Sequence, residues 1–173
     1  MTNYKILSTA LLSFMALIST TAGAEDNQPP AGFTSLFNGQ DMTGWKADPE
    51  GHWKAESGVI VYDGKATNLV SEKSFGDFIL LIDWKVEKGG NSGIFLRGGP
   101  QVEIWDNQSI GSGGIYPQAH KPLKVADNPA GEWNHVSVVA RGSHIEHWVN
   151  GTKIVECEVG SPDWDGRGAA SKF

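Results

Sequence analysis

The chain has 173 residues and a formal net charge of −6 at pH 7. Glycine accounts for 22 residues, roughly twice its usual share of about 7 %. With seven Trp, seven Phe and three Tyr, this composition favours short strands joined by tight turns over a helical bundle. An acidic chain without a basic run is a poor candidate for binding nucleic acid or anionic membranes, so we expect neither as a partner, whereas a neutral sugar remains compatible.

Residues 1–24 predict a cleaved signal peptide. Lys5 is their only charged residue, residues 6–18 are apolar apart from Ser and Thr, and residues 22–24 form a small-x-small cleavage pattern. The apolar run is too short to cross a bilayer comfortably, which argues against a membrane anchor. We expect cleavage near Ala24 and a secreted or periplasmic protein.

The mature chain is predicted to start with a flexible tail and continue as one domain. Residues 25–31 are polar and contain Pro29 and Pro30, which is typical of a terminal tail. The domain is expected to cover residues 32–173. Its single cysteine, Cys157, cannot form an intrachain disulfide, and we expect it to be a small buried hydrophobe.

The hydrophobic pattern of the domain has a period of two residues, which predicts strands. Residues 78–86 and 136–141 alternate in this way, and no segment predicts an amphipathic helix of ten residues. Asn150-Gly151 between two β-rich runs predicts a tight hairpin. The fold class is therefore all-β, a two-sheet antiparallel β-sandwich of jelly-roll type. The expected core positions are Phe78, Leu80, Ile82, Trp84, Val136 and Val138.

Several segments together carry a resemblance to a known family. They include GFTSLFNGQDMTGW at 32–45, NSGIFLR at 91–97, VEIWD at 102–106, GEWN at 131–134 and IEHWVNG at 145–151. In this order they resemble the 3-keto-disaccharide hydrolase family over nearly the whole mature chain. The resemblance implies a concanavalin-like jelly roll that cleaves the glycosidic bond of sugars oxidised at C3.

The end of the chain is expected to depart from this family. Family members continue beyond residues 171–173 with a glycine-rich loop and two closing strands. We therefore expect a domain that lacks these strands and exposes an unpaired edge.

The implied chemistry narrows the choice of site residues. A ketone at C3 acidifies the hydrogen on C2, so a base can remove this proton before the oxygen on C1 leaves and water adds. This route needs a base, an electrophile near the C3 oxygen and an acid for the leaving group. It does not need the two opposed carboxylates of conventional glycosidases.

Glu103 and His147 are the predicted catalytic residues. Glu103 lies in an apolar strand, where it is either a base or metal ligand or a member of a structural salt bridge. His147 lies between apolar residues, either lining the sugar cleft or packed as a core group. We expect both on one concave face, holding one divalent metal ion of unidentified type. Asp106 is expected to cap the turn at residues 106–107, and Trp105 is expected to face the core, away from Glu103.

Other polar residues are predicted to contact the oxidised sugar, each with a plain structural alternative. Arg97 could instead be a surface cation, Asn91 and Ser92 could cap the turn before their strand, and His120 could be a solvated loop residue. The predicted substrate-binding residues are Arg97, Asn91, Ser92, Tyr116 and His120.

Two classes of function fit the sequence. The first is an enzyme that cleaves 3-keto-glycosides by elimination and hydration. The second is a non-catalytic, lectin-like sandwich that binds glycans, because a fold alone implies no chemistry.

Overall fold

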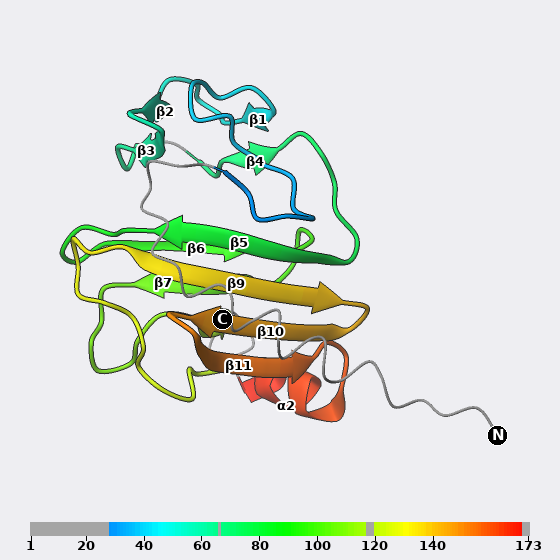
Figure 1. Ribbon diagram of the computed structural model, residues 1–173. Helices are drawn as coiled ribbons and strands as arrows, with labels where there is room; N and C mark the ends of the chain where they lie inside the picture. Colours follow the sequence, from blue (N-terminus) through cyan, green and yellow to red (C-terminus); the bar gives the residue numbers. More distant parts are fainter. Residues whose placement is uncertain (1–27, 66, 117–119, 171–173) are drawn as a thin grey trace. The chain divides into compact units, whose positions relative to one another are not determined.

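The computed structural model of the chain describes residues 28–65, 67–116 and 120–170 (Figure 1). The predicted signal peptide lies outside these residues, as do residues 25–27 of the predicted tail. Contacts divide the chain into two compact units, Met1–Lys73 and Ser74–Phe173. No helix among the described residues is long and apolar enough to cross a membrane.

The first unit contains two small antiparallel pairs of strands. β1 (Trp45–Lys46) pairs with β4 (Val70–Ser71), and β2 (Trp53–Glu56) pairs with β3 (Val59–Tyr62). Ser57 and Gly58 both have positive φ angles, 51° and 78°, at the turn between β2 and β3. This backbone explains a glycine at the turn, because glycine adopts such angles without steric cost.

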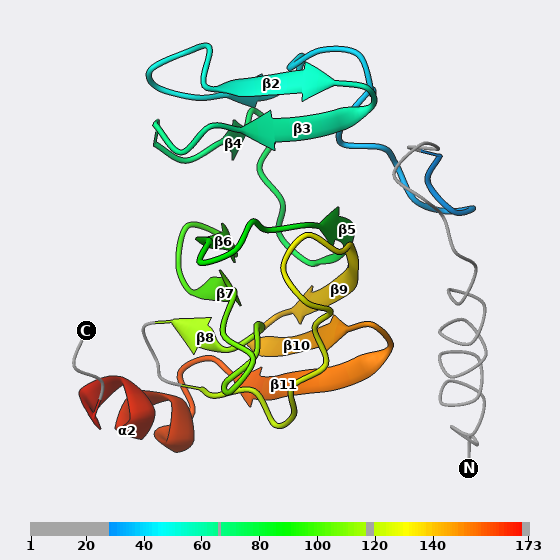
Figure 2. The same ribbon diagram turned by 90° about the vertical axis from the view of Figure 1, so that its left-hand side faces the viewer.

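The second unit is a sandwich of two antiparallel sheets (Figure 2). One layer has the order β11-β10-β9-β5. These strands are β5 (Phe78–Trp84), β9 (Asn134–Arg141), β10 (His144–Val149) and β11 (Thr152–Glu158). The other layer has the order β6-β7-β8. Its strands are β6 (Asn91–Phe95), β7 (Gln101–Trp105) and β8 (Ile115–Tyr116).

The core of the second unit lies between these two layers, and the alternating pattern that predicted it is confirmed. Side chains from both sheets form one apolar cluster. Because successive residues of a strand point to opposite faces, alternate residues supply the core. The six residues predicted from the sequence all belong to this cluster or pack against it: Phe78, Leu80, Ile82, Trp84, Val136 and Val138.

The predicted hairpin is also present, at the turn between β10 and β11. Asn150 and Gly151 have φ angles of 47° and 76°, which match the turn type that Asn-Gly favours. The Asn150 side chain donates to the carbonyl group of Ala126 and accepts from the backbone N–H of His135. The turn therefore also anchors two neighbouring segments.

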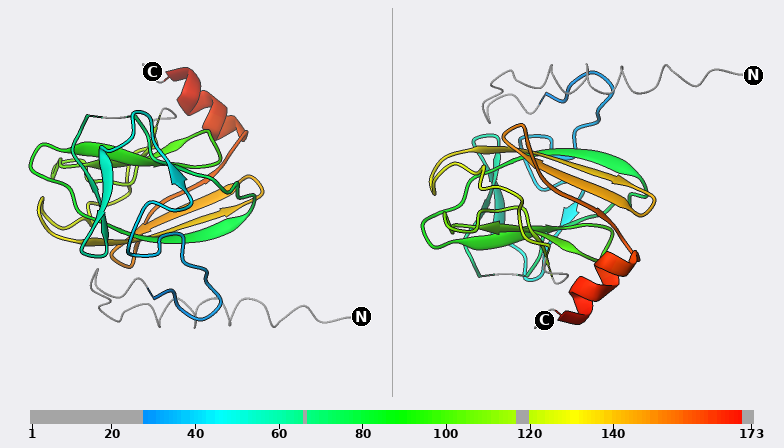
Figure 3. Two further views of the ribbon diagram at one scale, coloured as in Figure 1. Left: turned by 90° about the horizontal axis from the view of Figure 1, so that it is seen from above. Right: turned by 90° about the horizontal axis from the view of Figure 1, so that it is seen from below.

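One helix follows the last strand and was not predicted from the sequence. The helix α2 (Pro162–Ala170) has nine residues and lies at one end of the two layers (Figure 3). The Ser161 hydroxyl accepts from the backbone N–H of Trp164 at 3.2 Å, which caps its N-terminus. Pro162 suits the first helical position, and Arg167 pairs with Asp163 at 2.8 Å.

Candidate active site

The strands β6, β7 and β8 carry one polar and aromatic surface, here called the outer face. Val102, Ile104 and Ile115 point into the core, so the residues that alternate with them point outward. Strand register places these outward residues next to one another across the sheet. The outer face consists of Asn91, Gly93, Phe95, Gln101, Glu103, Trp105 and Tyr116.

Glu103 lies in the middle of the outer face and is the single acidic residue in β6, β7 and β8. Its Oε1 accepts a hydrogen bond from Asn91 Nδ2 at 2.9 Å. Its strand neighbours are glycines, because it pairs with Gly93 and its backbone N–H donates to Gly114 at 2.9 Å. The half-buried residue Glu103 therefore lies opposite a glycine on each side.

Gln101 completes the polar part of the outer face. A Cβ atom at Gly93 would lie 1.9 Å from Gln101 Nε2, so the Gln101 side chain lies directly across Gly93. Gln101 Nε2 also donates to the Ser92 carbonyl group at 3.2 Å. Two side-chain amides, Asn91 and Gln101, thus flank the carboxylate, and amides can bind both hydroxyl and carbonyl oxygens.

Aromatic rings border the carboxylate along the chain and across the sheet. Trp105 pairs with Asn91, and Tyr116 pairs with Gln101. The expectation that Trp105 faces the core is wrong, because residues two apart in a strand share a face and Ile104 takes the core position. Flat apolar rings next to amide groups suit the binding of a sugar ring.

Of the predicted site residues, the structure brings Glu103, Asn91 and Tyr116 together. The predictions missed Gln101 and Trp105, although their positions two residues before and after Glu103 would have placed them on its face. Ser92 does not join this group. It pairs with Ile104 and so points to the opposite face of the sheet from Asn91.

Arg97 also lies apart from Glu103, in the turn after β6. Its φ angle is 53°, and its Nη1 donates to the Gly142 carbonyl group at 2.6 Å. Asp77 lies 3.8 Å from Nη2, and the guanidinium sits over the Phe78 ring at 5.9 Å. The guanidinium thus contacts residues that are distant in the sequence, and the positive charge expected beside Glu103 is not observed there.

Asp106 has a structural role, but at a different turn from the one expected from the sequence. Its Oδ2 accepts from the backbone N–H of Gly89 at 2.7 Å, and its own N–H donates to Gly90. The carboxylate thereby holds the turn that precedes β6, whereas the expected cap was at residues 106–107.

The two predicted histidines are buried inside the second unit. His147 is 1 % exposed and points into the core with Ile145 and Val149. His120 is 7 % exposed and packs against the Trp164 ring, 5.6 Å between centroids. Burial lowers the pKa of His147 to about 4, against a smaller opposing effect of its hydrogen bond to Gly113. Burial also lowers the pKa of His120, with Arg167 adding to the effect.

The expected shared face of Glu103 and His147 is therefore wrong. Glu103 points outward from β7, whereas His147 points inward from β10. The Nδ1 atom of His147 is hydrogen bonded to the Gly113 carbonyl group at 3.0 Å. In this arrangement the two side chains cannot bind one metal ion together.

A different group of side chains could hold a divalent ion. His144, Glu146 and Glu156 offer ligand atoms within 4.8 Å of one another. They lie on the surface of the other sheet, where Lys153 Nζ is 2.6 Å from Glu156 and 3.6 Å from Glu146. Hydrogen bonds to Glu158 and Glu146 raise the pKa of His144. Lys153 and His144 are thus already paired with the carboxylates that a metal ion would need.

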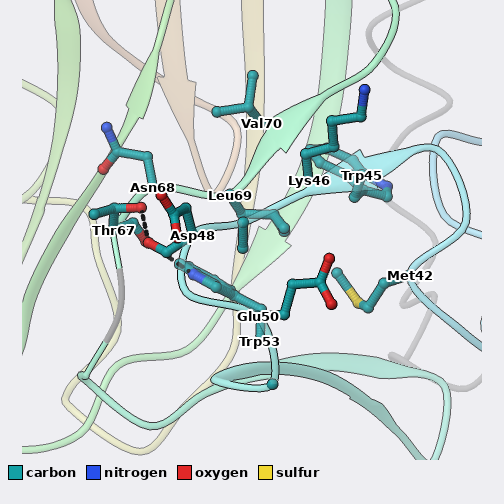
Figure 4. A pocket seen from close by; sticks show the side chains of 12 residues that line it. Met42, Trp45, Lys46, Asp48, Glu50, Trp53, Thr67, Asn68, Leu69 and Val70 are labelled. Carbon is teal, nitrogen blue, oxygen red and sulfur yellow. Dashed lines mark hydrogen bonds between the residues drawn. The ribbon is translucent and has the colours of Figure 1, made fainter.

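The first unit has a hollow of about 680 Å³, shown in Figure 4. It is lined by the indole rings of Trp45 and Trp53 and by side chains that include Asp48 and Glu50. Both indole N–H groups donate to backbone carbonyl groups of this unit, at 2.7 and 3.0 Å. The sequence-predicted site residues do not line this hollow, and all of them belong to the second unit.

Comparisons with known proteins agree with the fold and point to one family. The family described as "3-keto-alpha-glucoside-1,2-lyase-like domain" matches residues 32–172. A 3-keto-disaccharide hydrolase of Bacteroides thetaiotaomicron is 25 % identical over 82 % of this chain, which spans 64 % of that relative. The crystal structure of a putative glycosyl hydrolase from Parabacteroides distasonis has a TM-score of 0.71 and 32 % identity, covering 80 % of this chain and 77 % of its own. A second putative glycosyl hydrolase from that organism has a TM-score of 0.57 and 23 % identity, covering 66 % of each chain, and supports the fold alone.

Proposed function

The chain belongs to the 3-keto-alpha-glucoside-1,2-lyase-like family, and from this premise we propose that it cleaves the glycosidic bond of 3-keto-glycosides. The proposed reaction is an elimination followed by hydration. Export through the predicted signal peptide of residues 1–24 would place it outside the cytoplasm.

Glu103 is the proposed base. Its carboxylate takes the proton from C2, and the electron pair forms an enolate with the C3 carbonyl group. When the carbonyl re-forms, a C1–C2 double bond forms and the C1–O bond breaks, so that the departing oxygen takes up a proton. Water then adds across the double bond, with hydroxyl on C1 and hydrogen on C2, and the net result is hydrolysis.

The other groups of the outer face support binding and charge stabilisation. The amide N–H groups of Asn91 and Gln101 can donate to the C3 oxygen as negative charge develops there. The rings of Trp105 and Tyr116 can contact the apolar faces of the sugar. Both contributions follow from the cross-strand register that places these side chains around Glu103.

The observation that carries the proposal is the single carboxylate among amides and aromatic rings. Conventional glycosidases use two carboxyl groups on either side of the bond, about 5–10 Å apart. The strands of the outer face supply only Glu103. One base next to hydrogen-bond donors fits proton removal from C2 better than acid–base attack at C1.

The test compares a chromogenic 3-keto-glucoside with its unoxidised parent. Glu103→Gln keeps the shape of the side chain but removes the base, so turnover of the keto compound should fall about 10²-fold or more. Asp106→Asn is the matched control, because it removes a nearby carboxylate that holds a turn, and it should affect stability more than turnover. Unchanged turnover in Glu103→Gln, or cleavage of the parent compound, contradicts the proposal.

A glycan-binding protein without catalysis is the second candidate. The combination of rings and amides on the outer face also suits the binding of neutral sugars. A binding protein would retain the keto compound and its parent without releasing product from either. The same assay, combined with calorimetric titration, therefore separates the two functions.

A further inference from the structure

His147, at 1 % exposed, is the most deeply buried histidine among the described residues, and the proposed reaction leaves it unused. It points inward from β10 and lies across the core from the segment that contains Gly113. A carbonyl oxygen only accepts hydrogen bonds, so the 3.0 Å contact with Gly113 requires the proton of the neutral imidazole on Nδ1. The Nε2 atom then carries the lone pair.

Because this lone pair is buried, His147 lowers the stability of the folded protein relative to an apolar residue at the same position. Among the side-chain nitrogens of residues 28–65, 67–116 and 120–170, only Nε2 of His120 and Nε2 of His147 are buried without a hydrogen-bond partner. A buried acceptor without a partner lowers stability, whereas an apolar side chain of similar size would fill the same space without this penalty. What a histidine supplies here and a leucine cannot is the Nδ1–H donor.

The acceptor of this bond is next to Glu103. Gly113 donates its own N–H to the Glu103 carbonyl group at 2.8 Å, and the Glu103 N–H donates to Gly114 at 2.9 Å. Tyr116 follows in the same segment and pairs with Gln101. A shift of residues 113–116 would therefore move the backbone partners of Glu103 and the ring of Tyr116.

The contact between His147 and Gly113 is also unusually close. The φ angle of Gly113 is 102°, and a Cβ atom there would lie 2.7 Å from His147 Nδ1. No other residue fits this backbone without displacing the imidazole. The hydrogen bond therefore links the two layers of the sandwich at the point where β7 carries Glu103.

We propose that His147 is a positioning residue, whose Nδ1–H bond to the Gly113 carbonyl group holds residues 113–116 in place and thereby orients Glu103 and Tyr116. This inference rests on the proposed function for the role of Glu103. The structural part, that His147 controls the order of this segment, does not depend on the reaction.

The test compares three His147 variants in the full chain. His147→Leu fills the core but has no donor. His147→Asn places its amide nitrogen where Nδ1 was, and His147→Gln places its amide nitrogen near the position of Nε2. Ile145→Val is the matched control, because this core residue of β10 is also buried but makes no hydrogen bond to the segment.

The first measurement is hydrogen exchange at the Gly113 and Glu103 amides. In His147→Leu and His147→Gln both amides should exchange about 2- to 10-fold faster, the ratio expected for one hydrogen bond. His147→Asn and Ile145→Val should stay near the wild-type protein. If His147→Leu does not fold, the difference in amide exchange between His147→Asn and His147→Gln tests the proposal. If the exchange rates are unchanged in His147→Leu and His147→Gln, which lack a donor at the position of Nδ1, the proposal is wrong, whatever the activity of these variants.

The second measurement is turnover of the 3-keto-glucoside. Loss of orientation should lower kcat about tenfold in His147→Leu with a smaller change in KM, and His147→Asn should restore it. If His147→Asn keeps its amides protected but loses turnover, His147 is a catalytic residue and the proposal is wrong. If the wild-type protein does not cleave this substrate, the proposed function fails, while the exchange data still decide the role of His147.

Discussion

Acidification should destabilise the protein through His147 in particular. The unfolded chain takes up a proton on this residue near its ordinary pKa of 6.5, whereas burial delays protonation in the folded protein until a pKa of about 4. Between these values the unfolded state binds more protons, so the free energy of unfolding falls as the pH falls. The difference of the two pKa values corresponds to about 3 kcal/mol, fully lost by about pH 4.

Urea denaturation followed by tryptophan fluorescence, at pH 7 and at about pH 4, measures this effect. The wild-type protein is compared with His147→Leu, which cannot titrate at this position. Other groups titrate alike in both proteins, including His144, whose pKa is raised, so their effects cancel in the difference. Relative to the variant, the wild-type protein should lose about 3 kcal/mol between the two pH values. An equal loss in both proteins would refute the argument from burial.

Three further predictions concern residues outside the proposed reaction. Arg97→Ala removes the bond to the Gly142 carbonyl group, so it should lower the thermal midpoint and leave KM for the keto sugar unchanged, as read by calorimetry and initial rates. Trp164→Ala removes an indole that is 8 % exposed and packs on His120, and it should destabilise the protein by about 3–5 kcal/mol in a denaturant titration. Burial raises the pKa of the Cys157 thiol to about 11, so alkylation at pH 8 should be far slower in the native protein than in denaturant. Rapid alkylation of the native protein would contradict this burial.

The alternation of side chains was sufficient to predict β5 and β9, two strands of one sheet of the second unit. A strand can bury one face only if every second residue is apolar, so the pattern at residues 78–84 and 136–140 indicates both the element and its inward face. The Asn150-Gly151 turn could be predicted for a similarly local reason, because few residues accept its positive φ angles. The helix α2 was missed because its nine residues contain two glycines and little apolar periodicity.

The composition of the candidate site depended on contacts between segments that are distant in the chain. Parity within β7 places Gln101 on the same face as Glu103, but only the register between strands shows that Asn91 also lies beside Glu103. The same limit explains His147, whose apolar neighbours fit both a cleft and a core until the opposite layer supplies Gly113 as its partner. Local sequence determines backbone geometry and the spacing of faces, because those interactions span a few residues. Burial and hydrogen-bond partners are decided by the packing of the two layers, which brings residues dozens of positions apart into contact.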